Sequence, residues 1–142
     1  MKVFVDTNLF IDILLNREPF AENSALIYKL CENNMLEGYV APITLNNIYY
    51  ICRKAKHIED IKGYLLDIST VFTVAVLDSE SVKKANRYKI NDYEDALQYA
   101  MASQNTCEYL ITRNTKDFKN MDTLKVVTPE TFLEKMNIFS DS

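Results

Sequence analysis

The stretch VFVDTN, residues 3–8, places an aspartate directly after a short apolar run. Val and Phe favour strands, and a run that is apolar at every position predicts a strand buried on both faces of a sheet. Asp6 ends this strand with no glycine or other turn residue before it. A helix cap is one explanation, because an Asp after a strand commonly accepts backbone N–H groups of the next helix. A ligand role is the other, and residues elsewhere in the chain distinguish the two.

Short apolar runs alternate with helical patterns along the whole chain, without a linker rich in Pro, Gly or Ser. Such strands, separated by helices, form parallel sheets covered on both faces. We therefore predict a three-layer α/β/α sandwich with a central parallel sheet of four or five strands, in one domain over residues 1–142. Strands are expected at 2–5, 38–42, 71–77, 108–112 and 124–128, and helices at 8–15, 21–34, 44–55, 58–69, 79–90, 92–103 and from 129 onward.

The composition excludes several classes of function. With only two glycines, the chain cannot form glycine-rich phosphate-binding loops. Its single histidine rules out paired-histidine chemistry, and its three cysteines are too far apart for a CxxC metal site. The net charge of −4 argues against binding duplex DNA by general electrostatics. Because no apolar run is long enough for a membrane span and no secretory signal is recognisable, we expect a cytoplasmic protein.

Polar side chains follow three of the expected strands. Parallel sheets bind ligands at the carboxyl ends of their strands, so we expect these side chains to gather at one edge of the sheet. They are Asp6, Thr7 and Asn8 after the first strand, Thr44, Asn46 and Asn47 after the second, and Thr112, Arg113, Asn114 and Asp117 after the fourth.

Further carboxylates lie on the expected helix at 92–103. Asp92 and Asp95 are three residues apart and share one face near the helix N-terminus, where the helix dipole stabilises anions. Apolar residues surround Asp95 on nearly every side, which predicts a mostly buried carboxylate that needs a partner or a cation. Converging carboxylates favour Mg²⁺ or Mn²⁺, which takes oxygen ligands and activates water for phosphodiester hydrolysis.

Four segments together resemble the PIN domain, the metal-dependent nuclease fold of VapC-type toxins in bacterial toxin–antitoxin pairs. The resemblance extends from residue 1 to about residue 133. It implies an endoribonuclease that uses one or two Mg²⁺ or Mn²⁺ ions, forms a homodimer and, if it is a toxin, binds an antitoxin protein. The four segments are VFVDTNLFID (3–12), PITLNNIYYI (42–51), DYEDALQYAMA (92–102) and YLITRNTKDF (109–118).

The resemblance also implies a set of site residues. Asp6 and Asp95 match the first and third positions of the family's set of metal-binding acids, and Asn114 matches the fourth, with Asp117 close by as a substitute or supporting group. The family pattern has a Glu in the helix after the second strand, where this chain has Asn47. An amide oxygen can ligate a cation but brings no charge, so we expect lower metal affinity.

Other candidates are assigned supporting roles at this site. Asp92 is a hypothetical source of compensating charge, because it lies three residues from Asp95. The remaining candidates are Arg113 and Lys116 as phosphate contacts, Thr112 as a hydrogen-bond partner of a ligand carboxylate or water, and Asn8 as a positioning residue for Asp6.

Two alternatives to a ribonuclease stay open on the sequence. A haloacid-dehalogenase-like phosphotransferase also places an Asp after its first strand, but it normally repeats the acid two residues later, where this chain has Asn8. A PIN-like module that has lost catalysis through Asn47 would only bind RNA or protein. The sequence does not separate this module from an active toxin.

Overall fold

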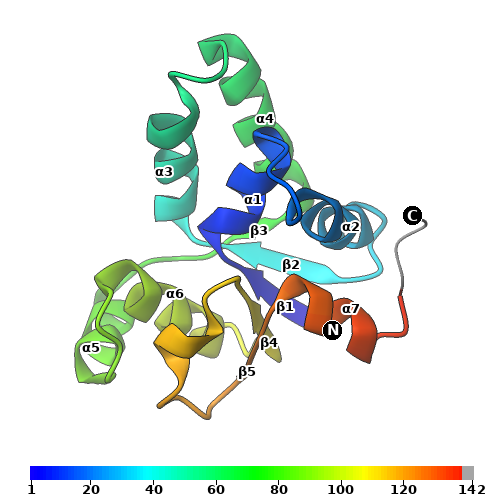
Figure 1. Ribbon diagram of the computed structural model, residues 1–142. Coiled ribbons are helices and arrows are strands. Elements are labelled where there is room, and N and C mark those ends of the chain that lie inside the picture. Colours follow the sequence, from blue (N-terminus) through cyan, green and yellow to red (C-terminus); the bar gives the residue numbers. More distant parts are fainter. Residues whose placement is uncertain (139–142) are drawn as a thin grey trace.

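The computed structural model describes residues 1–138, and it contains a five-stranded parallel sheet with the strand order β3-β2-β1-β4-β5 (Figure 1). Helices cover both faces, so the predicted α/β/α sandwich is confirmed. The strands are β1 (Lys2–Val5), β2 (Glu37–Val40), β3 (Thr73–Val74), β4 (Tyr109–Ile111) and β5 (Lys125–Val127). The helices are α1 (Thr7–Leu14), α2 (Ala21–Glu32), α3 (Pro42–Cys52), α4 (Ile58–Val71), α5 (Ser79–Arg87), α6 (Tyr93–Gln104), the 3₁₀ turn η1 (Thr115–Phe118) and α7 (Pro129–Lys135).

The two faces of the sheet carry separate hydrophobic cores. Val3 and Val5 of β1 point into a core shared with α1, α2, α3, α4 and α7, whereas Phe4 between them points into a core shared with α5 and α6. This division follows from the alternation of side chains along a strand. Figure 1 shows α5 and α6 on one side of the sheet and α1 to α4 on the other.

Side-chain caps set where several helices begin. Asp6 accepts the backbone N–H of Thr7 and caps α1. Asp78 and Ser81 form a reciprocal capping box at α5, which confirms the expected helix start there. Thr128 caps α7, and Pro129 occupies its first turn, where a missing N–H costs nothing.

The expected third strand at 71–77 is wrong in extent. Val71 still belongs to α4, and β3 contains only Thr73 and Val74. Ala75 donates one more hydrogen bond, to the carbonyl of Val40 at 2.8 Å, after which the chain leaves the sheet. An edge strand has a partner on one side only, so apolar composition alone does not extend it. The turn η1 was not predicted. Within residues 1–138, no helix is long and apolar enough to cross a membrane.

Gly38 on β2 is required by close packing. A Cβ atom at this position would lie 2.5 Å from Cδ2 of Phe72 and 2.8 Å from Sγ of Cys31. We expect Gly38→Ala to lower the free energy of unfolding by about 1–3 kcal/mol, the usual cost of overpacking a core. Urea denaturation measures this change. Gly63→Ala in α4 is the control, because a Cβ there meets nothing within 4 Å and should stabilise the helix by up to about 1 kcal/mol.

Candidate metal centre

The polar residues expected at one edge of the sheet do lie together. A cleft of about 440 Å³ opens beyond the carboxyl ends of the strands, between the first turns of α1 and α6 and the middle of α3. Five acids line it against a single arginine, so the cleft is strongly negative. The lining residues are Asp6, Thr7, Asn8, Ile11, Arg17, Asn47, Ile51, Asp92, Glu94, Asp95, Asn114 and Asp117.

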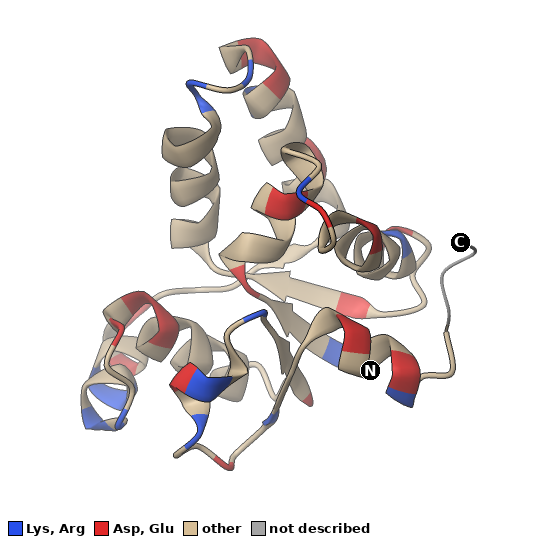
Figure 2. Ribbon diagram, in the orientation of Figure 1, with Lys and Arg blue, Asp and Glu red and all other residues tan. Residues whose placement is uncertain are grey.

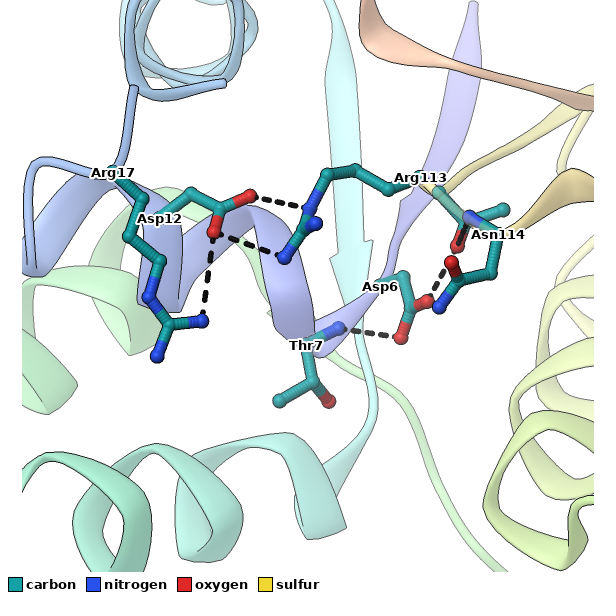
Figure 3. Close-up of polar contacts among 7 residues, drawn as sticks. Asp6, Thr7, Asp12, Arg17, Arg113 and Asn114 are labelled. Carbon is teal, nitrogen blue, oxygen red and sulfur yellow. Dashed lines mark hydrogen bonds and ion pairs between the residues drawn. The ribbon is translucent and has the colours of Figure 1, made fainter. Parts of the chain in front are cut away.

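Asp6 is held rigidly at the base of this cleft. Its side chain is 5% exposed, and its Oδ1 accepts the backbone N–H of Thr7 at 2.7 Å and Nε2 of Gln98 at 2.8 Å. Its Oδ2 accepts the hydroxyl of Thr112 at 2.6 Å. Figure 3 shows Thr7 on one side of the carboxylate and Asn114 on the other. Asp6 therefore serves as a helix cap and also presents its carboxylate to the cleft.

Three carboxylates converge in the cleft. Asp6, Glu94 and Asp95 each offer one oxygen, and the three oxygens lie within 4.8 Å of one another. Asp6 ends β1, while Glu94 and Asp95 lie in the first turn of α6. Across the described part of the chain, no Lys or Arg forms an ion pair with any of them. Close carboxylates without a basic partner form the donor set that a hard divalent cation prefers, so these residues fit Mg²⁺ or Mn²⁺.

The acid–base properties of the cluster agree with this interpretation. Burial, followed by the charges of Asp6, Asp92, Asp117 and Glu94, raises the pKa of Asp95 to about 7. Burial and the charge of Asp6 also raise the pKa of Glu94. A cation bound among the three oxygens would offset the repulsion that produces both shifts.

Glu94 was not predicted as a site residue. Adjacent residues in a helix point about 100° apart, so helical spacing alone does not place Glu94 and Asp95 at one site. In the first turn, however, Glu94 faces α3, and Nδ2 of Asn47 donates a hydrogen bond to its Oε1. Asn47, predicted as a ligand, therefore binds the carboxylate that stands beside it. The one sequence signal for Glu94 was its position within the segment DYEDALQYAMA.

The other predicted residues divide between the cleft and its surroundings. Asp92 is exposed and caps α6 by accepting the backbone N–H of Asp95 at 3.0 Å, so it is near the cluster but not one of its three carboxylates. Asn8, Asn114 and Asp117 line the cleft, as predicted.

Two predicted residues lie away from the carboxylates. Lys116 lies outside the cleft in a neighbouring groove. The guanidinium of Arg113 is directed to Asp12, a fully buried acid of α1 that sequence analysis missed. Arg113 Nε lies 2.7 Å from Asp12 Oδ2, and Arg113 Nη2 donates to Asp12 Oδ1 at 3.1 Å.

Asp12 is the centre of a small ion cluster. Arg17 lies 3.8 Å from its carboxylate, and Figure 3 shows Arg17 and Arg113 both pointing to Asp12. Burial raises the pKa of Asp12, and the charge of Arg113 opposes that rise. The guanidinium of Arg113 also stacks on the ring of Phe20 at 4.2 Å. These contacts tie the loop after β4 to α1, and a phosphate contact by Arg113 stays a prediction.

The pKa of Asp95 predicts how the metal-free protein responds to pH. Asp95 binds its proton more strongly when folded, with a pKa of about 7, than at its ordinary value of 3.8. Its contribution to stability is therefore complete below pH 3.8 and is lost as the pH rises through 7. In EDTA, we expect the melting temperature of Asp95→Asn to exceed that of the wild type at pH 8 and to approach it at pH 5.

Asp122→Asn is the matched control for this experiment. Asp122 is exposed, lies outside the cleft and loses the same charge on substitution. Its melting temperature should follow that of the wild type at both pH values. Equal melting temperatures of Asp95→Asn and Asp122→Asn at pH 8 would contradict the repulsion between Asp95 and its neighbouring acids.

The fold and the carboxylate cluster together define a class of protein. It is an α/β/α domain with a cluster of three carboxylates at the carboxyl edge of a parallel sheet. The sequence pattern of the PIN domain matches residues 2–116, and the chain belongs to the PIN domain family.

Comparisons with individual proteins agree with this assignment. The chain is 28% identical over 144 aligned positions to Ribonuclease VapC1 of Aquifex aeolicus (strain VF5), with 96% of each chain covered. Its fold is similar to that of a chain in the structure of VapBC2 from Rickettsia felis bound to promoter DNA, with a TM-score of 0.67 and 18% identity. The match covers 90% of this chain and 98% of that chain. A chain of a toxin–antitoxin complex from Klebsiella pneumoniae matches with a TM-score of 0.67 and 23% identity, over 89% of this chain and 97% of that chain.

Proposed function

We propose that this protein is a metal-dependent endoribonuclease and the toxin of a toxin–antitoxin pair. The observation that carries the proposal is the convergence of Asp6, Glu94 and Asp95 within 4.8 Å at the carboxyl edge of a PIN-domain sheet. Similarity over 96% of the chain to a protein named Ribonuclease VapC1 supports RNA as the substrate.

In this proposal Asp6, Glu94 and Asp95 hold Mg²⁺ or Mn²⁺. When bound, such an ion supplies an activated water and stabilises the leaving oxygen of a phosphodiester. Thr112 and Gln98 fix the orientation of the Asp6 carboxylate through their hydrogen bonds. Positioning of this kind matters because ligand orientation controls metal affinity.

Glu94 takes the place of the charge that Asn47 lacks. Asn47 donates its amide hydrogen to Oε1 of Glu94 and so holds that carboxylate toward Asp6 and Asp95. The centre therefore keeps three carboxylates although the family position on α3 is neutral. The binding-module alternative rested on a missing charge, and Glu94 removes the reason to prefer it.

The phosphotransferase alternative has no support at Asp6. The residue two positions later is Asn8 rather than the second acid of that class. The chain belongs to the PIN family, which is a different class of protein from the phosphotransferases.

The partners in this proposal are an RNA substrate, an antitoxin protein and a second copy of the chain, with the protein acting in the cytoplasm. The Klebsiella pneumoniae neighbour is a toxin–antitoxin complex, which supports an antitoxin partner for this chain. An upstream reading frame encoding a small DNA-binding protein would support it further.

The test is cleavage of a panel of structured RNAs with Mn²⁺ or with EDTA. We expect cleavage with Mn²⁺ only. Products should lack a 2′,3′-cyclic phosphate, because the single histidine, His57, caps α4 outside the cleft and cannot act with a second histidine on the ribose hydroxyl. Tight RNA binding without cleavage, unchanged in Asp6→Asn, would contradict the proposal and favour a binding module.

A further inference from the structure

A second groove opens directly beside the acidic cleft. It has a volume of about 580 Å³ and lies between the linker from α5 to α6 and the η1 turn with the residues after it. Asp92 and Asp117 line both the groove and the cleft, so the two spaces adjoin at these residues.

Lysines line both walls of this groove. Lys89 stands on the linker, and Lys116 and Lys119 stand on and just after η1. All three are exposed, and none forms an ion pair within residues 1–138. Figure 2 shows basic segments on α5 and on the turn after β4, and an acidic segment where β1 passes into α1. Asn91 and Asn120 add amide donors to the same walls.

The opposite side of the cleft lacks comparable charge. Helix α3, which borders it there, contains no Lys or Arg from Pro42 to Cys52. Arg17 is the one cation among the residues lining the cleft, and it lies 3.8 Å from the carboxylate of Asp12. Among the residues that line the cleft and the groove, the cations without an ion pair are therefore the three lysines of the groove.

We propose that the lysine groove binds the phosphodiester backbone of single-stranded RNA on one side of the scissile bond. Lysine ammonium groups neutralise phosphates without reading the base sequence. Asp6 is buried at the base of the cleft, so the scissile phosphate must enter it, and a flexible single strand does so without unpairing a duplex. This inference rests on the proposed function, which supplies the scissile bond at Asp6 and Asp95.

The groove and the metal centre act together in this arrangement. The five acids of the cleft repel an RNA strand, and bound cations offset that repulsion only locally. Phosphates next to the scissile one then lie along Lys89, Lys116 and Lys119, where the protein supplies the counter-charge. The strand leaves the metal centre between the α5–α6 linker and η1.

The test compares two variants that lose the same charge. The groove variant is Lys89→Gln/Lys116→Gln/Lys119→Gln. The control is Lys29→Gln/Lys62→Gln/Lys135→Gln, whose exposed lysines lie on α2, α4 and α7, outside both cleft and groove. Fluorescence anisotropy measures the binding of a labelled single-stranded 12-nucleotide RNA in Ca²⁺, and a gel checks afterwards that the RNA is intact.

We expect the groove variant to raise the Kd by roughly tenfold or more at low salt and the control to change it less than about twofold. The logarithm of the association constant falls linearly with the logarithm of the salt concentration, and the steepness of this line should decrease by about 2 in the groove variant. Each phosphate of a single strand neutralised by the protein contributes about 0.7 to that steepness. Mn²⁺ affinity, measured by calorimetry, should stay at the wild-type value in both variants. Equal RNA binding by the two triple variants overturns the inference.

The outcomes also separate this inference from the proposed function. Loss of RNA binding in the groove variant of a protein that never cleaves RNA supports the groove and contradicts the ribonuclease. Normal Mn²⁺-dependent cleavage with an unchanged KM in the groove variant contradicts the groove and leaves the ribonuclease intact.

Discussion

Asp95→Asn should lower Mn²⁺-dependent RNA cleavage by at least about a thousandfold, or roughly 4 kcal/mol of transition-state stabilisation. The substitution removes one of three carboxylates that lie within 4.8 Å and keeps the size of the side chain. It should also weaken Mn²⁺ binding, which calorimetry measures directly. Single-turnover cleavage at saturating RNA measures the loss of rate.

Stability measurements separate this effect from misfolding. Because burial and four neighbouring acids raise the pKa of Asp95 to about 7, its amide should stabilise the metal-free protein at pH 8. Asp95→Asn is therefore expected to be more stable and inactive at the same time. Asp122→Asn, with the same loss of charge at an exposed position, should cleave RNA at the wild-type rate. Full activity of Asp95→Asn would show that Asp95 is not a metal ligand.

Glu94→Gln should lower the cleavage rate by roughly a hundredfold and weaken Mn²⁺ binding in parallel. Glu94 contributes its charge from α6, and Asn47 holds it by donating a hydrogen bond. The amide of Gln can still accept that hydrogen bond but brings no charge to the cation. Removal of a group that only orients a metal ligand costs about 10- to 100-fold, so the loss of a proposed ligand should reach at least the upper end of that range.

Moving the charge back to α3 gives a sharper test. In Asn47→Glu/Glu94→Gln, the carboxylate lies at the family position, and its neighbour is neutral. We expect this double variant to recover at least tenfold over Glu94→Gln alone, both in rate and in Mn²⁺ affinity. Glu134→Gln, an exposed acid on α7, is the control for loss of one charge and should behave as the wild type. If the double variant were no better than the single one, Glu94 would not replace the α3 charge.

Much of the site could be predicted because its residues follow strand ends. A parallel sheet brings the carboxyl ends of β1 and β4 to the same edge, so Asp6, Thr112 and Asn114 had to lie close together. Asp95 was a candidate because its apolar neighbours indicated a mostly buried carboxylate, and the structure places it half-buried at the cleft. Asp92 lies three residues before Asp95 and was expected on the same helix face. It is exposed, because it is the cap residue just before α6 and accepts a backbone N–H group of the first turn.

Asp12 and Glu94 could not be predicted because their roles depend on the packing of elements distant in sequence. Asp12 has apolar neighbours along α1, but its main partner, Arg113, lies 101 residues later and reaches it only because α1 lies beside the loop after β4. Glu94 belongs to the site because α6 approaches α3, 47 residues earlier, closely enough for Asn47 to reach it. Neither contact leaves a local pattern.

The sequence by itself indicated the parallel sheet, the helices around it and the choice of Asp6 and Asp95 as candidate ligands, because strand ends and helical spacing are local properties of a chain. Only the tertiary structure decided where the third negative charge lies. The charge of a carboxylate cluster depends on side chains that converge through space, and the structure places Glu94 of α6 beside the neutral Asn47 of α3. In the stretch VFVDTN, strand β1 is followed by Asp6, whose carboxylate caps α1 and also faces Glu94 and Asp95.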